Sequence, residues 1–300
     1  MFGVTILGNN SALPAYDRHP TAQVITLSDQ LFLMDCGEGT QIQMNLYKIK
    51  RSRINHIFIS HLHGDHYFGL PGLITSYGLM NRVTDLHLYG PPQLKEILDL
   101  QLNVASTILP YKLYFHALEK EEFLVNDEHF SVECFKVVHR IDCWGFLFRE
   151  KRKPRKINIE ATTQYKVPVE FFEELKEGKD YSLNDGTIIS NEALTIPNKP
   201  SRKYAYCADT IYTESLSEKV KNVDLLYHES TYLKDKTDKA ASRFHSTSEQ
   251  AAMLAKLADV KKLLIGHFSS TYEYLDDFLA EAKAVFTDTQ LALEGQTFIV

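Results

Sequence analysis

A six-residue run of the sequence, His61-Leu62-His63-Gly64-Asp65-His66, carries three imidazoles and one carboxylate. Both groups are common ligands of zinc and of related metal ions. His61 and His63 lie two residues apart and can converge on one ion, while Asp65 and His66 face a second ion beside it. The alternative is a loop of solvated histidines, but side chains this close would repel one another when protonated. The run therefore predicts a metal site.

Two ions need more ligands than this run supplies, and three later residues could complete the site. Each of them follows a β-rich segment: His139 after 130–138, Asp209 after 204–208 and His267 after 262–266. The run itself follows the apolar segment 54–60, so all the ligands would leave the carboxyl ends of strands, where open α/β sheets hold their chemistry. A lone histidine after a strand is more often a core or loop residue. The prediction rests on the occurrence of all three.

Motifs along nearly the whole chain resemble those of ribonuclease Z, a metallo-β-lactamase-fold endonuclease that trims the 3′ end of precursor tRNA. They occur in the family's order: Asp35-Cys36-Gly37-Glu38-Gly39-Thr40-Gln41, His61 to His66, His139, Ala208-Asp209-Thr210, His228-Glu229-Ser230-Thr231, His245-Ser246-Thr247 and Gly266-His267-Phe268. Lactamases and glyoxalases of the superfamily lack the motifs that begin at His228 and His245. The resemblance implies a zinc-dependent phosphodiesterase that removes the 3′ trailer from precursor tRNA.

The resemblance also implies which residues bind the metal ions. His61, His63 and His139 would bind one zinc ion, Asp65, His66 and His267 the second, and Asp209 would bridge the two. Mn²⁺ or another divalent ion is an alternative to zinc. A hydroxide held between the ions would attack the phosphorus, because zinc lowers the pKa of its bound water.

Catalytic and supporting roles follow from the same resemblance. Asp65 would also take the proton from the attacking water. His245, oriented by Glu229, would stabilise the transition state or protonate the leaving oxygen. Asp35 and His228 match positions that orient metal ligands. The alternative for these two is a polar strand end and a capping or hydrogen-bonded core residue.

The resemblance implies an α/β fold, a metallo-β-lactamase-type αββα sandwich of two mixed β-sheets with helices on both outer faces. Periodicity predicts strands near 2–7, 22–27, 31–35, 54–60 and 85–89 and helices near 39–47, 69–80 and 92–102 in the first half. In the second half it predicts strands near 203–208, 223–228, 262–266 and 289–300 and helices near 247–258 and 273–286. Residues 1–300 are expected to form one such domain.

The charged segment at about 151–200 interrupts this pattern and is expected to be an insertion. In ribonuclease Z the corresponding segment is an arm that grips the tRNA elbow, but its usual Gly-Pro signature is absent here. An ordinary helical insertion that packs on the sandwich or on a partner subunit is the alternative. A second departure is Pro14-Ala15-Tyr16-Asp17-Arg18-His19, where the family typically has Pro-x-Lys-x-Arg-Asn. This loop bears on discrimination against mature CCA-ended tRNA.

The net charge of −6 contrasts with a nucleic-acid substrate, which needs local positive potential. Two basic clusters could supply that potential: Lys48, Lys50, Arg51 and Arg53, and Arg149, Lys151, Arg152, Lys153, Arg155 and Lys156. A run of charges is usually only a solvated face. Either cluster can therefore be RNA-binding or merely exposed.

The composition is that of a globular enzyme, with 44% hydrophobic residues. No window approaches the roughly 18–20 apolar residues of a membrane span, so no membrane association is expected. The four cysteines lack CxxC spacing, which favours reduced thiols in a cytoplasmic protein. Family resemblance favours a homodimer. The alternatives to tRNA processing are a less selective binuclear zinc phosphodiesterase or nuclease and a catalytically silent RNA-binding scaffold.

Overall fold

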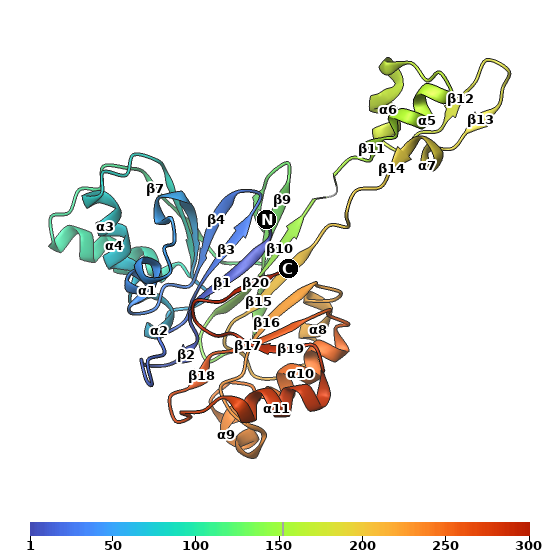
Figure 1. Cartoon of the computed structure of the whole chain (residues 1–300). Coiled ribbons are helices and arrows are strands. Elements are labelled where there is room, and N and C mark those ends of the chain that lie inside the picture. The colour runs from blue at the N-terminus through green and yellow to red at the C-terminus, as the bar shows by residue number, and fades with distance from the viewer. Residues whose placement is uncertain (152) are drawn as a thin grey trace. The chain divides into compact units, whose positions relative to one another are not determined.

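The computed structural model describes residues 1–151 and 153–300. The chain divides into two compact units, one formed by Met1–Arg149 with Arg202–Val300 and the other by Glu150–Ser201. Two seven-stranded sheets run through the larger unit (Figure 1).

The first sheet has the strand order β20, β1, β3, β4, β5, β6, β7. Its strands are β1 (Gly3–Gly8), β3 (Ala22–Leu27), β4 (Gln30–Met34), β5 (Ile54–Phe58), β6 (Leu86–Gly90), β7 (Leu113–Ala117) and β20 (Thr297–Ile299). Strands β4 to β7 are parallel, whereas β20, β1, β3 and β4 pair antiparallel. The sheet is therefore mixed.

The second sheet has the order β19, β17, β16, β15, β10, β9, β8. Its strands are β8 (Phe123–Asn126), β9 (Phe130–Val137), β10 (Cys143–Glu150), β15 (Lys203–Cys207), β16 (Leu225–Glu229), β17 (Leu263–Gly266) and β19 (Thr289–Leu291). Strands β15, β16, β17 and β19 are parallel, and β15 pairs antiparallel with β10. This sheet is mixed as well.

Alternation of side chains along the strands builds two apolar layers. In β4, Phe32 and Met34 contribute to the core that includes Phe146 and Phe148 of the second sheet. Leu33, between them, belongs to the separate cluster under the helices. Successive residues of a strand point to opposite faces, so one apolar strand serves both layers. The central strands of this sheet are covered on both faces, so their sequences are nearly continuously apolar.

Helices cover the outer face of each sheet (Figure 1). The first sheet carries α1 (Thr40–Leu46), α3 (Leu70–Leu79) and α4 (Gln93–Val104), and the second carries α8 (Leu216–Lys219), α10 (Ser248–Leu257) and α11 (Asp276–Val285). Shorter elements are α2 (Gly64–Tyr67), α9 (Thr237–Ser242), η1 (Arg51–Arg53), η3 (Lys234–Lys236) and the paired β2 (Asn10–Ser11) and β18 (Phe268–Ser269). The predicted αββα arrangement of two mixed sheets is confirmed.

The smaller unit is built on its own apolar centre of Val167, Leu175 and Leu194. It contains α5 (Ile159–Gln164), η2 (Val169–Phe171), α6 (Phe172–Lys176) and α7 (Asn191–Leu194), with the two-stranded pairs β11 (Lys156–Ile157) with β14 (Thr195–Ile196) and β12 (Tyr181–Ser182) with β13 (Ile188–Ile189). The side-chain amide of Asn191 donates hydrogen bonds to the backbone oxygens of Leu175 and Lys179. These residues close a separate small fold.

The expectation of one strand over 289–300 is wrong. Strand β19 belongs to the second sheet and β20 to the first, because the chain turns between them at Gly295, whose φ is 78°. Such a left-handed conformation suits glycine. Strands β7, β8 and β10 were not anticipated as elements. In the part of the chain that the structure describes, no helix is long and apolar enough to span a membrane.

Candidate metal centre

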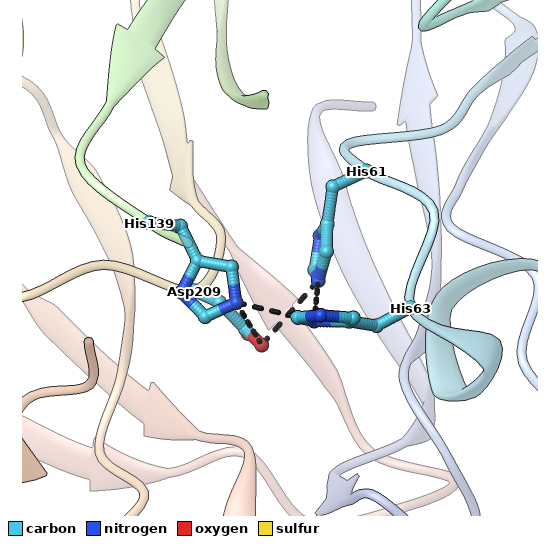
Figure 2. Close-up of side chains that lie close together, drawn as sticks. All are labelled: His61, His63, His139 and Asp209. Atoms are coloured by element: carbon cyan, nitrogen blue, oxygen red, sulfur yellow. Dashed lines mark hydrogen bonds and ion pairs between the residues drawn. The ribbon is translucent and has the colours of Figure 1, made fainter. Parts of the chain in front are cut away.

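The predicted ligands meet at the carboxyl ends of strands from both sheets. His61 and His63 follow β5 of the first sheet, and His139 and Asp209 follow β9 and β15 of the second. Figure 2 shows these four side chains converging from the two sides of the sandwich. Asp65, His66 and His267 form a second group, and Asp209, His245 and His267 a third. All seven predicted ligands therefore come together.

The first group is dominated by ring nitrogens. Nδ1 of His63 lies 3.0 Å from Nε2 of His61 and 3.1 Å from Nε2 of His139. The carboxylate oxygen Oδ2 of Asp209 lies 3.5 Å from Nε2 of His61 and 3.9 Å from Nε2 of His139. Burial lowers the pKa of all three histidines, and that of His63 falls to about 4. The rings are therefore neutral and can offer lone pairs.

For two of these rings, a hydrogen bond on the far side decides which nitrogen carries the lone pair. Nδ1 of His139 donates to the backbone oxygen of Phe244 at 2.9 Å, and Nδ1 of His61 donates to Oγ of Ser60 at 3.0 Å. In neutral imidazole the other nitrogen is then unprotonated. The Nε2 lone pairs of both rings consequently point at one another and at His63, an arrangement that a cation would stabilise.

The second group places two imidazoles against two carboxylates. Nε2 of His66 and Nε2 of His267 are 3.3 Å apart. Oδ1 of Asp209 lies 3.4 Å from the first of these atoms and 3.2 Å from the second. Oδ2 of Asp65 lies 3.6 and 3.4 Å from them. Burial alone would lower the pKa of His66, but the carboxylates of Asp209, Asp65 and Asp35 raise it well above its usual value.

These separations fit a divalent metal. Ligand atoms at zinc bond lengths in a tetrahedral shell lie about 3.3 Å from one another. The neighbouring ligand atoms of both groups lie close to that spacing, and Oδ1 of Asp209 is buried without a hydrogen-bond partner among the described residues. Two histidine-rich sets joined by one carboxylate match the donor chemistry of zinc. The residues present therefore fit two ions, with one oxygen of Asp209 directed at each.

Asp35 supports ligands of both groups, as the resemblance implied. The residue is fully buried, and its oxygen Oδ2 accepts hydrogen bonds from Nδ1 of His66 at 2.8 Å and from Oγ of Ser60 at 2.9 Å. Ser60 in turn accepts a hydrogen bond from Nδ1 of His61. Asp35 itself has φ of 54°, a conformation uncommon outside glycine, which turns the chain sharply after β4. One carboxylate thus orients a ligand in each group.

His245 and Glu229 form a buried pair beside the ligands. Nδ1 of His245 donates to Oε1 of Glu229 at 2.9 Å. Burial lowers the pKa of His245, but Glu229 and the nearby Asp209 and Asp65 outweigh this effect and raise it to about 9. The imidazole therefore holds its proton at neutral pH, as a general acid requires. Thr247, two residues later, forms a capping box with Gln250 that begins α10 and secures the chain here.

Thr231 was not predicted to act at the site. Its hydroxyl donates to Oε2 of Glu229 at 2.7 Å and accepts the Nδ1 proton of His267 at 2.9 Å. It thereby joins the Glu229 pair to a metal ligand. Gly266, directly before His267, has no room for a side chain, because a Cβ there would lie 2.5 Å from the hydroxyl of Tyr227. Thr231 stands in a quoted motif, but threonine is too common a residue to indicate the role by itself.

Asp65 lies among the candidate ligands of the second group. Its oxygen Oδ2 also accepts the backbone N–H of Ala12 at 2.7 Å. Burial by itself would raise the pKa of this carboxyl. The nearby His66 and His267 have the larger effect and bring the pKa below its usual range. A strongly ionised carboxylate suits metal binding better than proton abstraction, so the additional role as a base stays a prediction.

His228 does not support a ligand. Residues alternate along β16, so His228 faces away from the side that Glu229 occupies. Its Nδ1 donates to the backbone oxygen of Glu229 at 2.7 Å, and Nε2 has no hydrogen-bond partner among residues 1–151 and 153–300. Burial lowers its pKa, so the ring is neutral. Its alternative reading as a hydrogen-bonded core residue describes it better.

The basic residues are partly engaged within the protein. Arg149 forms an ion pair with Glu133 at 2.6 Å, and Arg155 donates to Oγ1 of Thr195 at 2.5 Å. Arg152 lies outside the described residues. A cavity of about 260 Å³ within the smaller unit is lined by Lys153, Arg155, Pro197, Asn198, Lys199, Pro200 and Ser201. In the first cluster Arg51 donates to the side chain of Asn45.

Arg18, in the loop that departs from the family pattern, is also engaged. Its guanidinium donates to Oδ1 of Asn10 at 3.0 Å and to the backbone oxygens of Glu273 and Tyr272. It also lies over the ring of Tyr16, 5.3 Å from the centroid. The retained arginine thus ties the loop to the protein itself.

Known proteins resemble this chain over its length. Residues 2–288 match the family described as "Anti-Pycsar protein Apyc1". A ribonuclease Z of Bacteroides thetaiotaomicron is 44% identical over 301 residues, covering 100% of this chain and 95% of the relative. The structure of human tRNase Z, short form, is 27% identical with a TM-score of 0.72, covering 99% and 98% of the two chains.

A metallo-β-lactamase-fold protein of Bacillus subtilis, YhfI, is 20% identical with a TM-score of 0.71, covering 99% of this chain and 98% of its own. At this identity the likeness concerns the fold alone. The predicted metallo-β-lactamase-type fold is confirmed.

Proposed function

The chain belongs to the ribonuclease Z family and to the family described as Anti-Pycsar protein Apyc1, and from this premise we propose that it is an endoribonuclease that removes the 3′ trailer from precursor tRNA. It is a hydrolase with the metallo-β-lactamase fold. The proposal rests on one observation above all. The paired His245 and Glu229 lie beside the two ligand groups, which supports a role for His245 as a proton donor to a reaction at those groups.

Different residues of the chain would bind the metal ions and donate the proton during hydrolysis. His61, His63 and His139 would hold one divalent ion, Asp65, His66 and His267 the other, and Asp209 both. The chemistry that such ions supply is the activation of water as a nucleophile at neutral pH. His245 would give its proton to the leaving ribose oxygen, and Glu229 would hold the imidazolium in place during that transfer. We take the ions to be two Zn²⁺ per chain.

The direct test is cleavage of a precursor tRNA with a 3′ trailer by the metal-loaded protein, followed by mapping of the cut. A cut at the start of the trailer supports the proposal. The same RNA ending in mature CCA should be tested in parallel, because the loop at Pro14 to His19 departs from the family pattern. Failure to cut any RNA while small phosphodiesters are hydrolysed would contradict the assignment to tRNA.

The second candidate, a less selective phosphodiesterase or nuclease, is favoured by one observation. Arg18 is the arginine retained from the family's loop, and its guanidinium is bound to backbone and side-chain oxygens of this protein. A guanidinium engaged in this way is a weaker contact for the end of an RNA. Comparable cleavage of precursor, mature and unstructured RNA would support this candidate.

We also propose that the protein is a cytoplasmic homodimer. The described cysteines are all buried free thiols, which suits a reducing compartment. Large apolar side chains are exposed in and after α3 and α4: Leu79, Val83, Leu100, Val104 and Ile108. Because contiguous exposed apolar surface commonly marks subunit contacts, we propose these side chains as candidates for the interface. Analytical ultracentrifugation of Val104→Lys with Ile108→Lys, compared with the native chain, tests the dimer.

A further inference from the structure

Strand β15 sends two buried tyrosines across the sandwich to the first sheet. Tyr204 and Tyr206 lie two residues apart and therefore point to the same face. The hydroxyl of Tyr206 donates to Oδ2 of Asp35 at 2.6 Å, and that of Tyr204 donates to Oε1 of Gln23 at 2.5 Å. Both tyrosines are fully buried. They differ in what they reach, since only Asp35 contacts the metal centre.

The hydroxyl of Tyr206 donates to the same Asp35 oxygen that supports a candidate ligand in each group. Oδ2 of Asp35 accepts this bond together with those from His66 and Ser60, and Ser60 holds His61. A buried carboxylate is stabilised by several donors, and loss of one lets it rotate or change its charge distribution. Any such change reaches a ligand of each ion.

The same tyrosine is also tied to the bridging ligand. Tyr206 lies near the end of β15, and Asp209 follows three residues later, just after that strand. His66 and Asp209 face each other across the site, with 3.4 Å between Nε2 and Oδ1. A closed path thus runs from Tyr206 through Asp35 and His66 to Asp209 and back along the chain. It joins the ligands of the first sheet to those of the second.

We propose that Tyr206 is a positioning residue, whose hydrogen bond to Asp35 holds the two halves of the binuclear centre in register. The inference rests on the proposed metal centre and concerns the affinity for the ions. Residues that orient metal ligands typically alter metal affinity or activity by about 10- to 100-fold. Because Tyr206 acts through Asp35, the effect expected lies at about the tenfold end of that range.

The test compares Tyr206→Phe with Tyr204→Phe, which removes an equally buried hydroxyl from the same strand. Zinc affinity of the full chain is measured by competition with a chelator. Tyr206→Phe should bind zinc about tenfold more weakly, and Tyr204→Phe within about twofold of the native chain. The visible absorption of the Co²⁺-loaded protein, which reports ligand geometry, should change only in Tyr206→Phe.

A double variant tests whether the effect passes through Asp35. In an Asp35→Asn background, the further change Tyr206→Phe should leave zinc affinity within about twofold, since the acceptor has already been altered. A full additional loss would overturn the proposed path. Equal losses in Tyr204→Phe and Tyr206→Phe, or no loss in either, would overturn the role of Tyr206.

Two other outcomes are also decisive. Circular dichroism and thermal unfolding of the metal-free variants show whether each one folds. Failure of Tyr206→Phe alone to fold would assign the hydroxyl to stability and overturn a role in positioning. A native chain that folds but binds no zinc or Co²⁺ would refute the metal centre itself, and thus the function proposed above.

Discussion

Nδ1 of His245 is bound to Oε1 of Glu229 at 2.9 Å, within a pair whose carboxylate is fully buried. Backbone N–H groups of Thr210 and Ser246 donate to the same oxygen. The carboxylate is therefore fixed by its surroundings, and it holds one ring nitrogen of His245. Because Glu229 holds His245, the proposed proton donor can be tested apart from the candidate metal ligands.

His245→Ala should lower turnover of precursor tRNA by about 10²- to 10⁴-fold, because the leaving oxygen loses its acid. Zinc content, measured by elemental analysis, should stay that of the native protein. Hydrolysis of bis-p-nitrophenyl phosphate should fall much less, since nitrophenolate leaves without a proton. Loss of zinc together with activity would make His245 a ligand or a structural support.

Asp209→Ala should remove both metal ions, because one oxygen of this carboxylate faces each ligand group. Elemental analysis after gel filtration measures the loss, with about two zinc ions expected in the native chain. Asp99→Ala, which alters an exposed aspartate paired with Lys95 on α4, is the control and should retain both. One ion in the native chain, or two in Asp209→Ala, would contradict the binuclear assignment.

Lys153 and Lys199, which line the cavity of the smaller unit, are predicted to contact RNA phosphates. Replacing both by Ala should weaken binding of precursor tRNA and reduce the slope of log affinity against log salt by about 0.7 to 0.9 per lysine. Filter binding over a salt series measures the slope, and cleavage of bis-p-nitrophenyl phosphate should not change.

Lys176→Ala with Lys179→Ala is the matched control. It removes the same charge from the same unit, but from lysines paired with Glu173 and Glu174. If the two double variants bind RNA equally well, the cavity lysines make no specific contact. Equal losses on RNA and on the small substrate would mean that the change damaged the fold or the site.

His56 predicts acid sensitivity away from the metal centre. Its ring lies among His87, Tyr89 and Phe32, and burial, followed by repulsion from His87 and His116, lowers its pKa to about 4. The unfolded chain binds a proton near the ordinary value of about 6.5, so stability is retained above that pH and lost as the pH falls toward 4. The loss could reach about 3 kcal/mol, at about 1.4 kcal/mol per pKa unit.

His56→Phe should flatten the fall in the free energy of unfolding between pH 6.5 and pH 4, measured by urea denaturation. The baseline at neutral pH can shift, because Tyr89 loses a hydrogen bond to the ring, so the slope is the measurement. His129→Gln, at an exposed position, should leave the slope unchanged. An identical slope in the native chain and His56→Phe would refute this account.

Sequence reasoning could choose candidate ligands because metal chemistry demands rare residue types at strand ends. His139, Asp209 and His267 could be chosen for that reason, and the structure brings them to the first run. Tyr206, Ser60 and Thr231 could not be chosen in the same way. Their hydroxyls acquire a role only from the register of one strand against another, which local sequence does not encode.

The same limit explains the errors in the fold. The separation of β19 from β20 depends on which sheet edge remains open, and that is a property of the assembled sandwich. His228 and Glu229 look equally suited to a site in the sequence. Their alternation along β16 directs only Glu229 toward it. Periodicity therefore predicted most of the long elements and the family resemblance predicted their layers, but neither predicted individual contacts.

The pairing of β20 with β1 affects how the chain folds while it is being synthesised. Because of this pairing, one edge of β1 receives its partner only after residues 297–299 have been synthesised. Until then the backbone groups along that edge of the nascent chain can pair with other strands, a known route to aggregation. Chaperones that shield the emerging chain should therefore matter most before residues 297–299 are translated.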